Sequence, residues 1–145
     1  MYFIENILDE LKIKYEKKHN NHHINYLCNL TFDDEVNFPF RINIDNNDEV
    51  MGIYTYCIMG IKADIKVKLL EIINELNTDN VYGTFYIDED NELYYYNGIS
   101  LEGETFNLNI NQMHDYISNM LSSVRELVEK CIEENVVNVG EMVGE

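Results

Sequence analysis

The stretch that decides the fold reads ADIKVKLLEIINELN (63–77), TDNVYGTFYIDED (78–90) and NELYYYNGISLEG (91–103). In its first part, apolar residues recur with a period near 3.6, which predicts an amphipathic helix. They are Ile65, Leu69, Ile72, Ile73 and Leu76. Asn, Thr and Asp residues follow between positions 74 and 80. Because such side chains bond the backbone locally, we expect the helix to end near Asn77.

The second and third parts predict a β-hairpin with the polar turn Asp88–Glu92. Alternation places Phe85 and Ile87 on the inner face, whereas Tyr82, Thr84 and Tyr86 share the outer face. Burial of the inner face fixes the register, because a slip of one residue would expose Leu93. The expected pairs are Ile87 with Leu93, Phe85 with Tyr95, Tyr86 with Tyr94, and Thr84 with Tyr96.

Two further signals come from glycines in the hairpin. Gly83 indicates a close backbone approach or a bulge. Asn97-Gly98 is a tight-turn pair and predicts the end of the second strand.

Outside this stretch, period-two and helical patterns predict five more elements. They are a helix over 3–15, strands over 24–32, 38–45 and 50–59, and a helix over 111–135 with Asn111 as N-cap. The strand over 50–59 is apolar on both faces, so we expect it to be central. The element order is α-β-β-β-α-β-β-α, which predicts an α+β fold with an antiparallel sheet packed against helices. We expect one domain over 1–139 and a flexible tail over 140–145.

The net charge of −17 disfavours nucleic acid and anionic lipid as partners. No Lys or Arg stands between Lys68 and Arg125. That interval carries Glu71, Glu75, Asp79, Asp88, Glu89, Asp90, Glu92, Glu102, Glu104 and Asp115. We expect such a surface to serve solubility. The alternative is that it attracts a basic segment of a partner protein.

Three separated cysteines, Cys28, Cys57 and Cys131, are expected to be reduced core thiols of a cytoplasmic protein. The N-terminus lacks the pattern of a signal peptide, and no apolar run approaches the length of a membrane span.

The loop HNNHH brings His19, His22 and His23 together in sequence. A metal-dependent hydrolase built on these histidines is the alternative function, but the ligand spacing of metal sites is missing. We expect the acidic turns at 45–49 and 88–92 to be hairpin turns and not calcium loops. Counting from Asp88, Leu93 and Ile99 stand where a calcium loop requires Gly and Glu. We therefore expect no cofactor and no catalytic residue.

The block from Leu69 to Gly103, with LLEIINELN, GTFYID, ELYYY and GISLEG, resembles YbjN-like proteins. The element order is similar to that of class I type III secretion chaperones. The resemblance implies a small acidic protein, often dimeric, that binds other proteins as a chaperone or as a regulator of sensory transduction.

The function expected from the sequence is therefore a non-enzymatic protein-binding module. Its candidate binding residues are Tyr82, Tyr86, Tyr94 and Tyr96, which supply apolar area with a polar tip. The partner is expected to be apolar at its centre and basic at its margin, and the protein is expected to be a homodimer. A purely structural subunit of a homo-oligomer is the remaining alternative.

Overall fold

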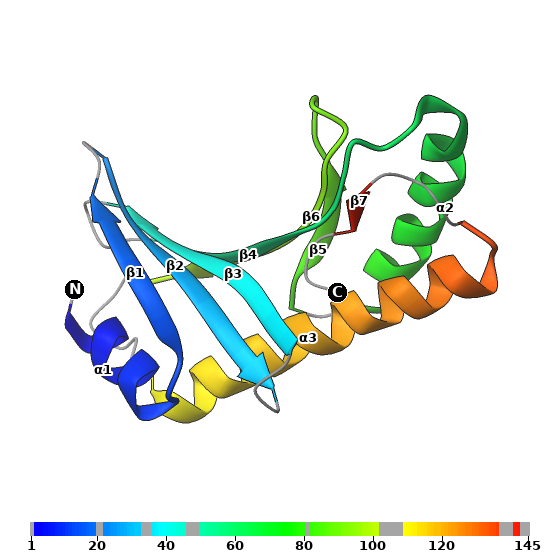
Figure 1. The fold of residues 1–145 in the computed structure, drawn as a ribbon. Helices are drawn as coiled ribbons and strands as arrows, with labels where there is room; N and C mark the ends of the chain where they lie inside the picture. Colours follow the sequence, from blue (N-terminus) through cyan, green and yellow to red (C-terminus); the bar gives the residue numbers. More distant parts are fainter. Residues whose placement is uncertain are drawn as a thin grey trace. The chain divides into compact units, whose positions relative to one another are not determined.

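The computed structural model describes residues 2–19, 22–32, 36–45, 50–80, 82–101, 109–136 and 141–142. Its elements, in chain order, are α1 (Tyr2–Glu10), β1 (Lys14–His19), β2 (His23–Phe32), β3 (Val36–Asp45), β4 (Val50–Met59), α2 (Ala63–Asp79), β5 (Thr84–Ile87), β6 (Leu93–Ser100), α3 (Ile110–Glu133) and β7 (Glu141–Met142) (Figure 1). The predicted α+β class is confirmed. Turns expected at 33–35 and 46–49, the acids Glu102 and Glu104, and most of the tail lie outside the described residues.

The strands form one sheet in the order β1-β2-β3-β4-β6-β5, and β7 pairs with β4. The β1–β2, β2–β3, β3–β4 and β5–β6 pairs are antiparallel. The central place predicted for the strand over 50–59 is confirmed, because β4 lies between β3 and β6. β6 continues to Ser100, so the strand end predicted at Asn97-Gly98 is wrong. Pairing beside β4 outweighs the local turn preference of that dipeptide.

The predicted first helix is too long, because α1 ends at Glu10 and Lys14–His19 form β1. Lys12 has a φ of +59°, and the N–H groups of Lys12 and Ile13 donate to the carbonyls of Asp9 and Leu8. This pair of bonds is the Schellman ending of a helix, with Lys12 in the position that glycine usually takes. β1 then pairs with β2 along its whole length.

The last helix begins at Ile110, one residue earlier than predicted, and Asn109 rather than Asn111 is its N-cap. Asn109 Oδ1 accepts the N–H of Gln112 at 2.9 Å, and Gln112 Oε1 accepts the N–H of Asn109 at 3.0 Å. This reciprocal pair is a capping box. α3 ends before Asn135, another left-handed residue, with a φ of +58°.

Two compact units divide the chain, and each is described by itself. The first comprises the described parts of 1–55 and 97–116, and the second those of 56–96 and 117–143. The prediction of a single domain over 1–139 stays a prediction.

In the first unit, α1 lies beside β1 and buries Ile4 and Leu8 (Figure 1). Glu5 connects this helix to the sheet, because its Oε2 accepts hydrogen bonds from Lys17 Nζ and Tyr26 Oη, both at 3.1 Å. Burial raises the pKa of Glu5, but these two bonds and the Lys17 charge outweigh it and hold the pKa below its ordinary value. The strands contribute the rest of the core, including Tyr26, Cys28, Phe40, Ile42, Ile44, Met51 and Ile53.

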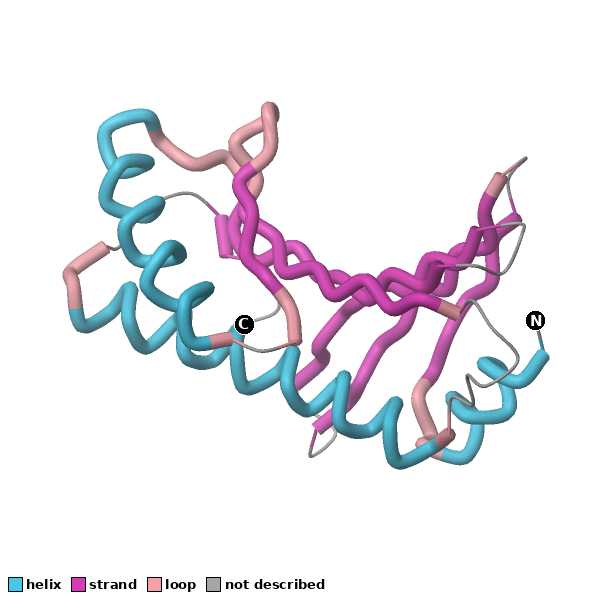
Figure 2. The backbone as a smooth tube through the Cα atoms, turned by 180° about the vertical axis from the view of Figure 1, so that it is seen from behind, coloured by secondary structure: helices cyan, strands magenta, loops and turns pink. Residues whose placement is uncertain are grey.

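In the second unit, α2 and the C-terminal part of α3 lie side by side along one face of β5 and β6 (Figure 2). Two ion pairs lie between them: Lys130 of α3 pairs with Glu75 of α2 at 3.4 Å, and Glu134, the residue after α3, pairs with Lys68 of α2 at 2.8 Å. The buried face of α2 is the predicted one, Leu69, Ile72, Ile73 and Leu76. It packs with Phe85, Leu93, Tyr95, Met120 and Leu127 as the core of this unit.

Candidate functional site

The hairpin has the predicted register. Thr84 pairs with Tyr96, Phe85 with Tyr95, Tyr86 with Tyr94, and Ile87 with Leu93. The two faces of the hairpin therefore carry the residues that the alternation assigned to them, with the exception of Tyr82.

The inner face is part of the core. The Phe85 and Tyr95 rings meet edge to face at 5.6 Å, and Tyr95 Oη donates to Asn119 Oδ1 at 2.7 Å. Burial raises the pKa of Tyr95 to about 12. A Cβ atom on Gly83 would overlap the Tyr95 ring and hydroxyl, so the close approach predicted at this glycine is confirmed.

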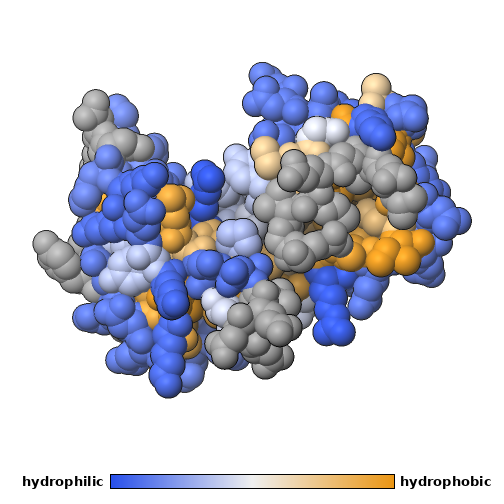
Figure 3. Space-filling model, viewed as in Figure 1, coloured by the Kyte–Doolittle hydropathy of each residue, from blue (hydrophilic) through white to orange (hydrophobic). Residues whose placement is uncertain are grey.

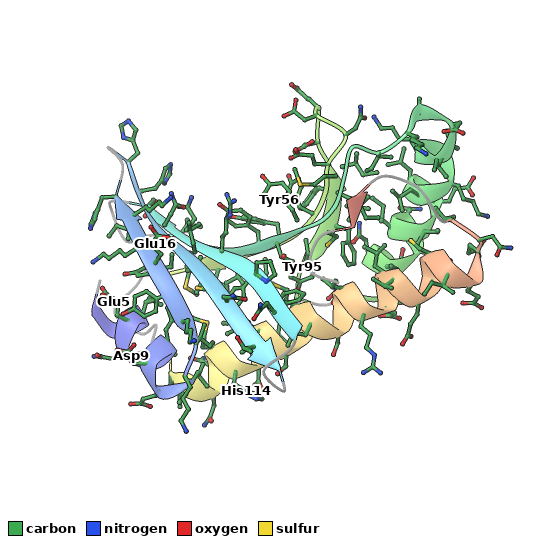
Figure 4. All side chains as sticks on the ribbon, viewed as in Figure 1. Glu5, Asp9, Glu16, Tyr56, Tyr95 and His114 are labelled. Atoms are coloured by element: carbon green, nitrogen blue, oxygen red, sulfur yellow. The ribbon has the colours of Figure 1, made fainter. Side chains whose placement is uncertain are left out.

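The outer face carries three tyrosines in a row, and we call Tyr56, Tyr86 and Tyr94 the tyrosine ladder. Tyr86 stacks on Tyr94 with 5.5 Å between ring centroids, and Tyr94 meets Tyr56 at 5.7 Å. The ladder thus crosses the three neighbouring strands β5, β6 and β4. Figure 4 places Tyr56 on one side of the sheet and Tyr95 on the side nearer α3. Tyr86 is 44% exposed, so the end of the ladder is accessible to a partner.

Sequence reasoning missed Tyr56. Tyr54 and Tyr56 stand in a strand whose two faces both read as apolar or aromatic, so the pattern did not say which face they take. Only the position of β4 next to β6 brings Tyr56 to Tyr94.

The other two predicted residues lie outside the ladder. Tyr96 is half-buried opposite Thr84. Tyr82 precedes β5 and does not share the outer face; it is 50% exposed and lines a cavity with residues of α2 and α3. Its predicted place beside Tyr86 is therefore wrong, because the strand begins only at Thr84.

In the hairpin turn, the side chain of Asp88 forms internal hydrogen bonds. Asp88 Oδ1 accepts the N–H groups of Asp90 and Glu92, each at 3.0 Å. Asn91 has a φ of +58°, its carbonyl accepts the N–H of Ile61, and its side chain accepts Lys66 Nζ at 2.9 Å. The turn at 88–92 is thus the hairpin turn predicted from the sequence, and it is attached to α2 and to the segment before it.

The outer edge of β5 is occupied by a side chain of α2. Asn77 Oδ1 accepts the N–H of Phe85 at 2.7 Å, and Asn77 Nδ2 donates to the Phe85 carbonyl at 3.0 Å. The amide therefore makes the two hydrogen bonds that a further strand would make at this residue. No sequence pattern signals this role, since it depends on where α2 packs.

Three histidines of the first unit, His19, His22 and His23, lie around the β1–β2 turn. His19 ends β1 and His23 begins β2, and the His22 and His23 rings are 6.4 Å apart. Within the described ranges, no three His, Cys, Asp or Glu side chains gather where they could hold a metal ion. His114 lies on α3, with Nδ1 3.8 Å from Asp115.

Among the described residues, the three cysteines are buried and form no disulfide. Burial raises the pKa of Cys28 and of Cys57 to about 12, and it also raises the pKa of Cys131. Burial thus favours the protonated form of these thiols. In the part of the chain that the structure describes, no helix is long and apolar enough to cross a membrane.

These observations define an α+β protein whose β5–β6 hairpin carries a row of tyrosines and an acidic turn. Residues 4–133 match the YbjN family, described as "Putative bacterial sensory transduction regulator". The chain belongs to this family, whose description is that of a regulator.

Two solved structures share the fold. An uncharacterized protein from Methanothermobacter thermautotrophicus is similar with a TM-score of 0.69 and 13% identity, over 91% of this chain and 96% of that one. YbjN from E. coli, described as "a putative transcription regulator", is similar with a TM-score of 0.60 and 13% identity, over 92% and 91% of the two chains. No curated protein matches the sequence.

Proposed function

We propose that this chain is a non-enzymatic regulator that acts by binding an extended segment of another protein on the tyrosine ladder. The observation that carries the proposal is the row of Tyr56, Tyr86 and Tyr94 across three strands, with Tyr86 44% exposed. Aromatic side chains present large contact areas at little cost in conformational entropy, and they are enriched at protein interfaces. Family membership supports a regulatory role.

The charges beside the ladder indicate the chemistry of the partner. Asp88, Glu89, Asp90 and Glu92 form the turn that joins β5 to β6. A partner segment with an apolar centre and a basic margin fits this arrangement, and its association rate should fall as salt is raised. More specifically, we propose that the protein holds such a segment as a chaperone does.

The test is capture of partners from a native lysate by three immobilised proteins. These are wild type, the double variant Tyr86→Ser/Tyr94→Ser, and the control Tyr116→Ser, which removes a half-buried tyrosine of the other unit. We expect the double variant to lose a protein that wild type and the control retain, since hot-spot residues contribute about 2 kcal/mol or more. Equal retention by all three proteins would place the binding surface elsewhere.

The folding of the double variant must be checked separately. Cross-strand pairs on an outer face contribute roughly 0.2–1 kcal/mol, so its thermal unfolding should stay close to that of wild type.

We also propose that the protein is a homodimer. Val67 and Leu70 of α2 are 67% and 43% exposed, and Ile132 of α3 is 64% exposed. Figure 3 shows apolar surface where α2 and the end of α3 lie. A second copy would remove such side chains from water.

Sedimentation should give twice the mass of the chain, and Val67→Glu should give the monomer mass, whereas the exposed exchange Lys62→Glu should not. A monomeric wild type at high concentration would contradict the proposal.

A further inference from the structure

A cavity of about 180 Å³ opens in the second unit between the C-terminal end of α2, the segment before β5, and α3. Tyr82 lines this cavity, away from the tyrosine ladder. The cavity lies on the side of the sheet that faces α3, because Asn119 in its wall accepts the Tyr95 hydroxyl.

Hydrogen bonds fix the walls of the cavity before any ligand arrives. Asn80 Nδ2 donates to Ser123 Oγ at 3.0 Å, and Asn80 Oδ1 accepts the N–H of Tyr82 at 3.2 Å. Ser123 is only 6% exposed. The Asn80 amide and the Ser123 hydroxyl are thus engaged with one another, and the exposed lining residues form the rim that can contact a ligand.

The rim carries two carboxylates and an aromatic ring. Asp79 and Glu126 are exposed, and neither forms an ion pair within the described part of the chain. Arg125, the neighbour of Glu126, pairs instead with Glu129 at 3.4 Å. Tyr82 is 50% exposed, and Leu76 gives the cavity an apolar wall.

The position of Asp79 is unfavourable for the helix itself. Asp79 is the last residue of α2, and the last turn of α2 holds no basic residue. A negative charge at a helix C-terminus opposes the helix dipole, so this carboxylate costs stability where it stands. A cation bound beside Asp79 would interact favourably with both the carboxylate and the helix C-terminus.

We propose that this cavity binds the guanidinium group of an arginine side chain. A planar guanidinium stacks on the Tyr82 ring and forks toward a carboxylate, whereas its methylene stem contacts Leu76. The arginine would belong to the basic margin of the partner segment, so in this respect the inference rests on the proposed function and names one residue of the partner.

The test uses N-acetyl-arginine amide as probe and needs no partner protein. Titration followed by amide NMR shifts should perturb Tyr82, Asn119 and Ser123, with a dissociation constant on the order of 1–10 mM, as expected for one side chain. The affinity should fall as salt is raised. Shifts spread over the acidic surface without these residues, or equal affinity for N-acetyl-lysine amide, would overturn the guanidinium site.

Variants separate a binding role from a structural one. Glu126→Gln and Tyr82→Leu should each weaken the probe about threefold, whereas Glu71→Gln, an exposed charge change on α2, should not. Asp79→Asn should weaken the probe and leave the melting temperature equal or higher, because it removes a charge that opposes the dipole. A lower melting temperature for Asp79→Asn with unchanged probe affinity would show a structural role and overturn the proposal.

The outcome is distinguishable from that of the proposed function. Tyr86→Ser/Tyr94→Ser should bind the probe as wild type does, because the ladder does not line the cavity. If the probe binds but no protein is captured in a way that depends on Tyr86 and Tyr94, the proposed function is refuted and the guanidinium site still stands.

Discussion

Gly83 has no room for a side chain, because an added Cβ would overlap the Tyr95 ring. Gly83→Ala should therefore lower the free energy of unfolding by about 1–3 kcal/mol through overpacking. Urea denaturation measures this change. Gly60→Ala is the comparison, since Gly60 has a φ of +64° but no atom within 4 Å of its added Cβ, so only backbone strain is introduced.

The same clash can be examined by a double-mutant cycle. In a Tyr95→Leu background the ring is gone, so Gly83→Ala should be much less destabilising than in wild type. If the two changes are additive, the overlap with Tyr95 is not the reason for glycine at this position.

At the scale of elements, Asn77 connects α2 to β5 through both hydrogen bonds to Phe85. Asn77→Ala leaves the Phe85 N–H and carbonyl without these partners and should lower the free energy of unfolding by about 1–3 kcal/mol. Hydrogen exchange at the Phe85 amide should accelerate as well. Asn74→Ala, an exposed asparagine of the same helix, is the matched control and should change neither quantity by much.

A distinction among the Asn77 variants sharpens this prediction. Asn77→Asp keeps the acceptor for the Phe85 N–H but loses the donor to its carbonyl, which the carboxylate would instead repel. It should be at least as destabilising as Asn77→Ala. A stable Asn77→Asp protein would show that the bond to the carbonyl contributes nothing.

Elements with a clear period were predictable from the sequence, and β1 shows why one was not. The hairpin register followed from the single requirement that Phe85, Ile87, Leu93 and Tyr95 face the core. β1 reads KYEKKH and is an edge strand, and its inward Lys17 pairs with Glu5 of α1. An ion pair therefore stands where an apolar residue would have revealed the strand.

The candidate site was predictable only in part, for a related reason. Tyr86 and Tyr94 share the ladder because they are cross-strand neighbours within one hairpin, which local alternation can predict. Tyr56 and the cavity at Tyr82 depend on contacts between elements far apart in sequence. Periodicity carries no information on such contacts.

At the scale of the whole molecule, buried thiol and phenol groups should make the stability of the fold decrease at alkaline pH. The pKa values of Cys28, Cys57 and Tyr95 are raised to about 12 by burial. The unfolded chain releases these protons first, so the stability that they contribute is complete below the unfolded thiol pKa of about 8.5 and is lost as pH rises toward 12. The free energy of unfolding should therefore fall over that range.

A thiol variant provides the control for the alkaline transition. Cys57→Ala removes one titrating group and should make the decline above pH about 8.5 shallower, even though the protein is less stable at neutral pH. A decline of unchanged slope would mean that Cys57 is accessible to solvent in the folded protein. Rapid labelling of native protein by a thiol reagent would indicate the same.

The amide of Asn77 at the edge of β5 also bears on how the protein behaves in concentrated solution. Each time the last turn of α2 frays, the N–H and the carbonyl of Phe85 lose their bonds to Asn77. A strand of another molecule can then form hydrogen bonds with both groups. The rate of edge-to-edge association is then governed by a local opening of one helix end and not by global unfolding. The time for which a concentrated solution stays free of aggregates would therefore depend on how often the last turn of α2 opens. A cation bound beside Asp79 would lengthen that time by keeping this turn helical.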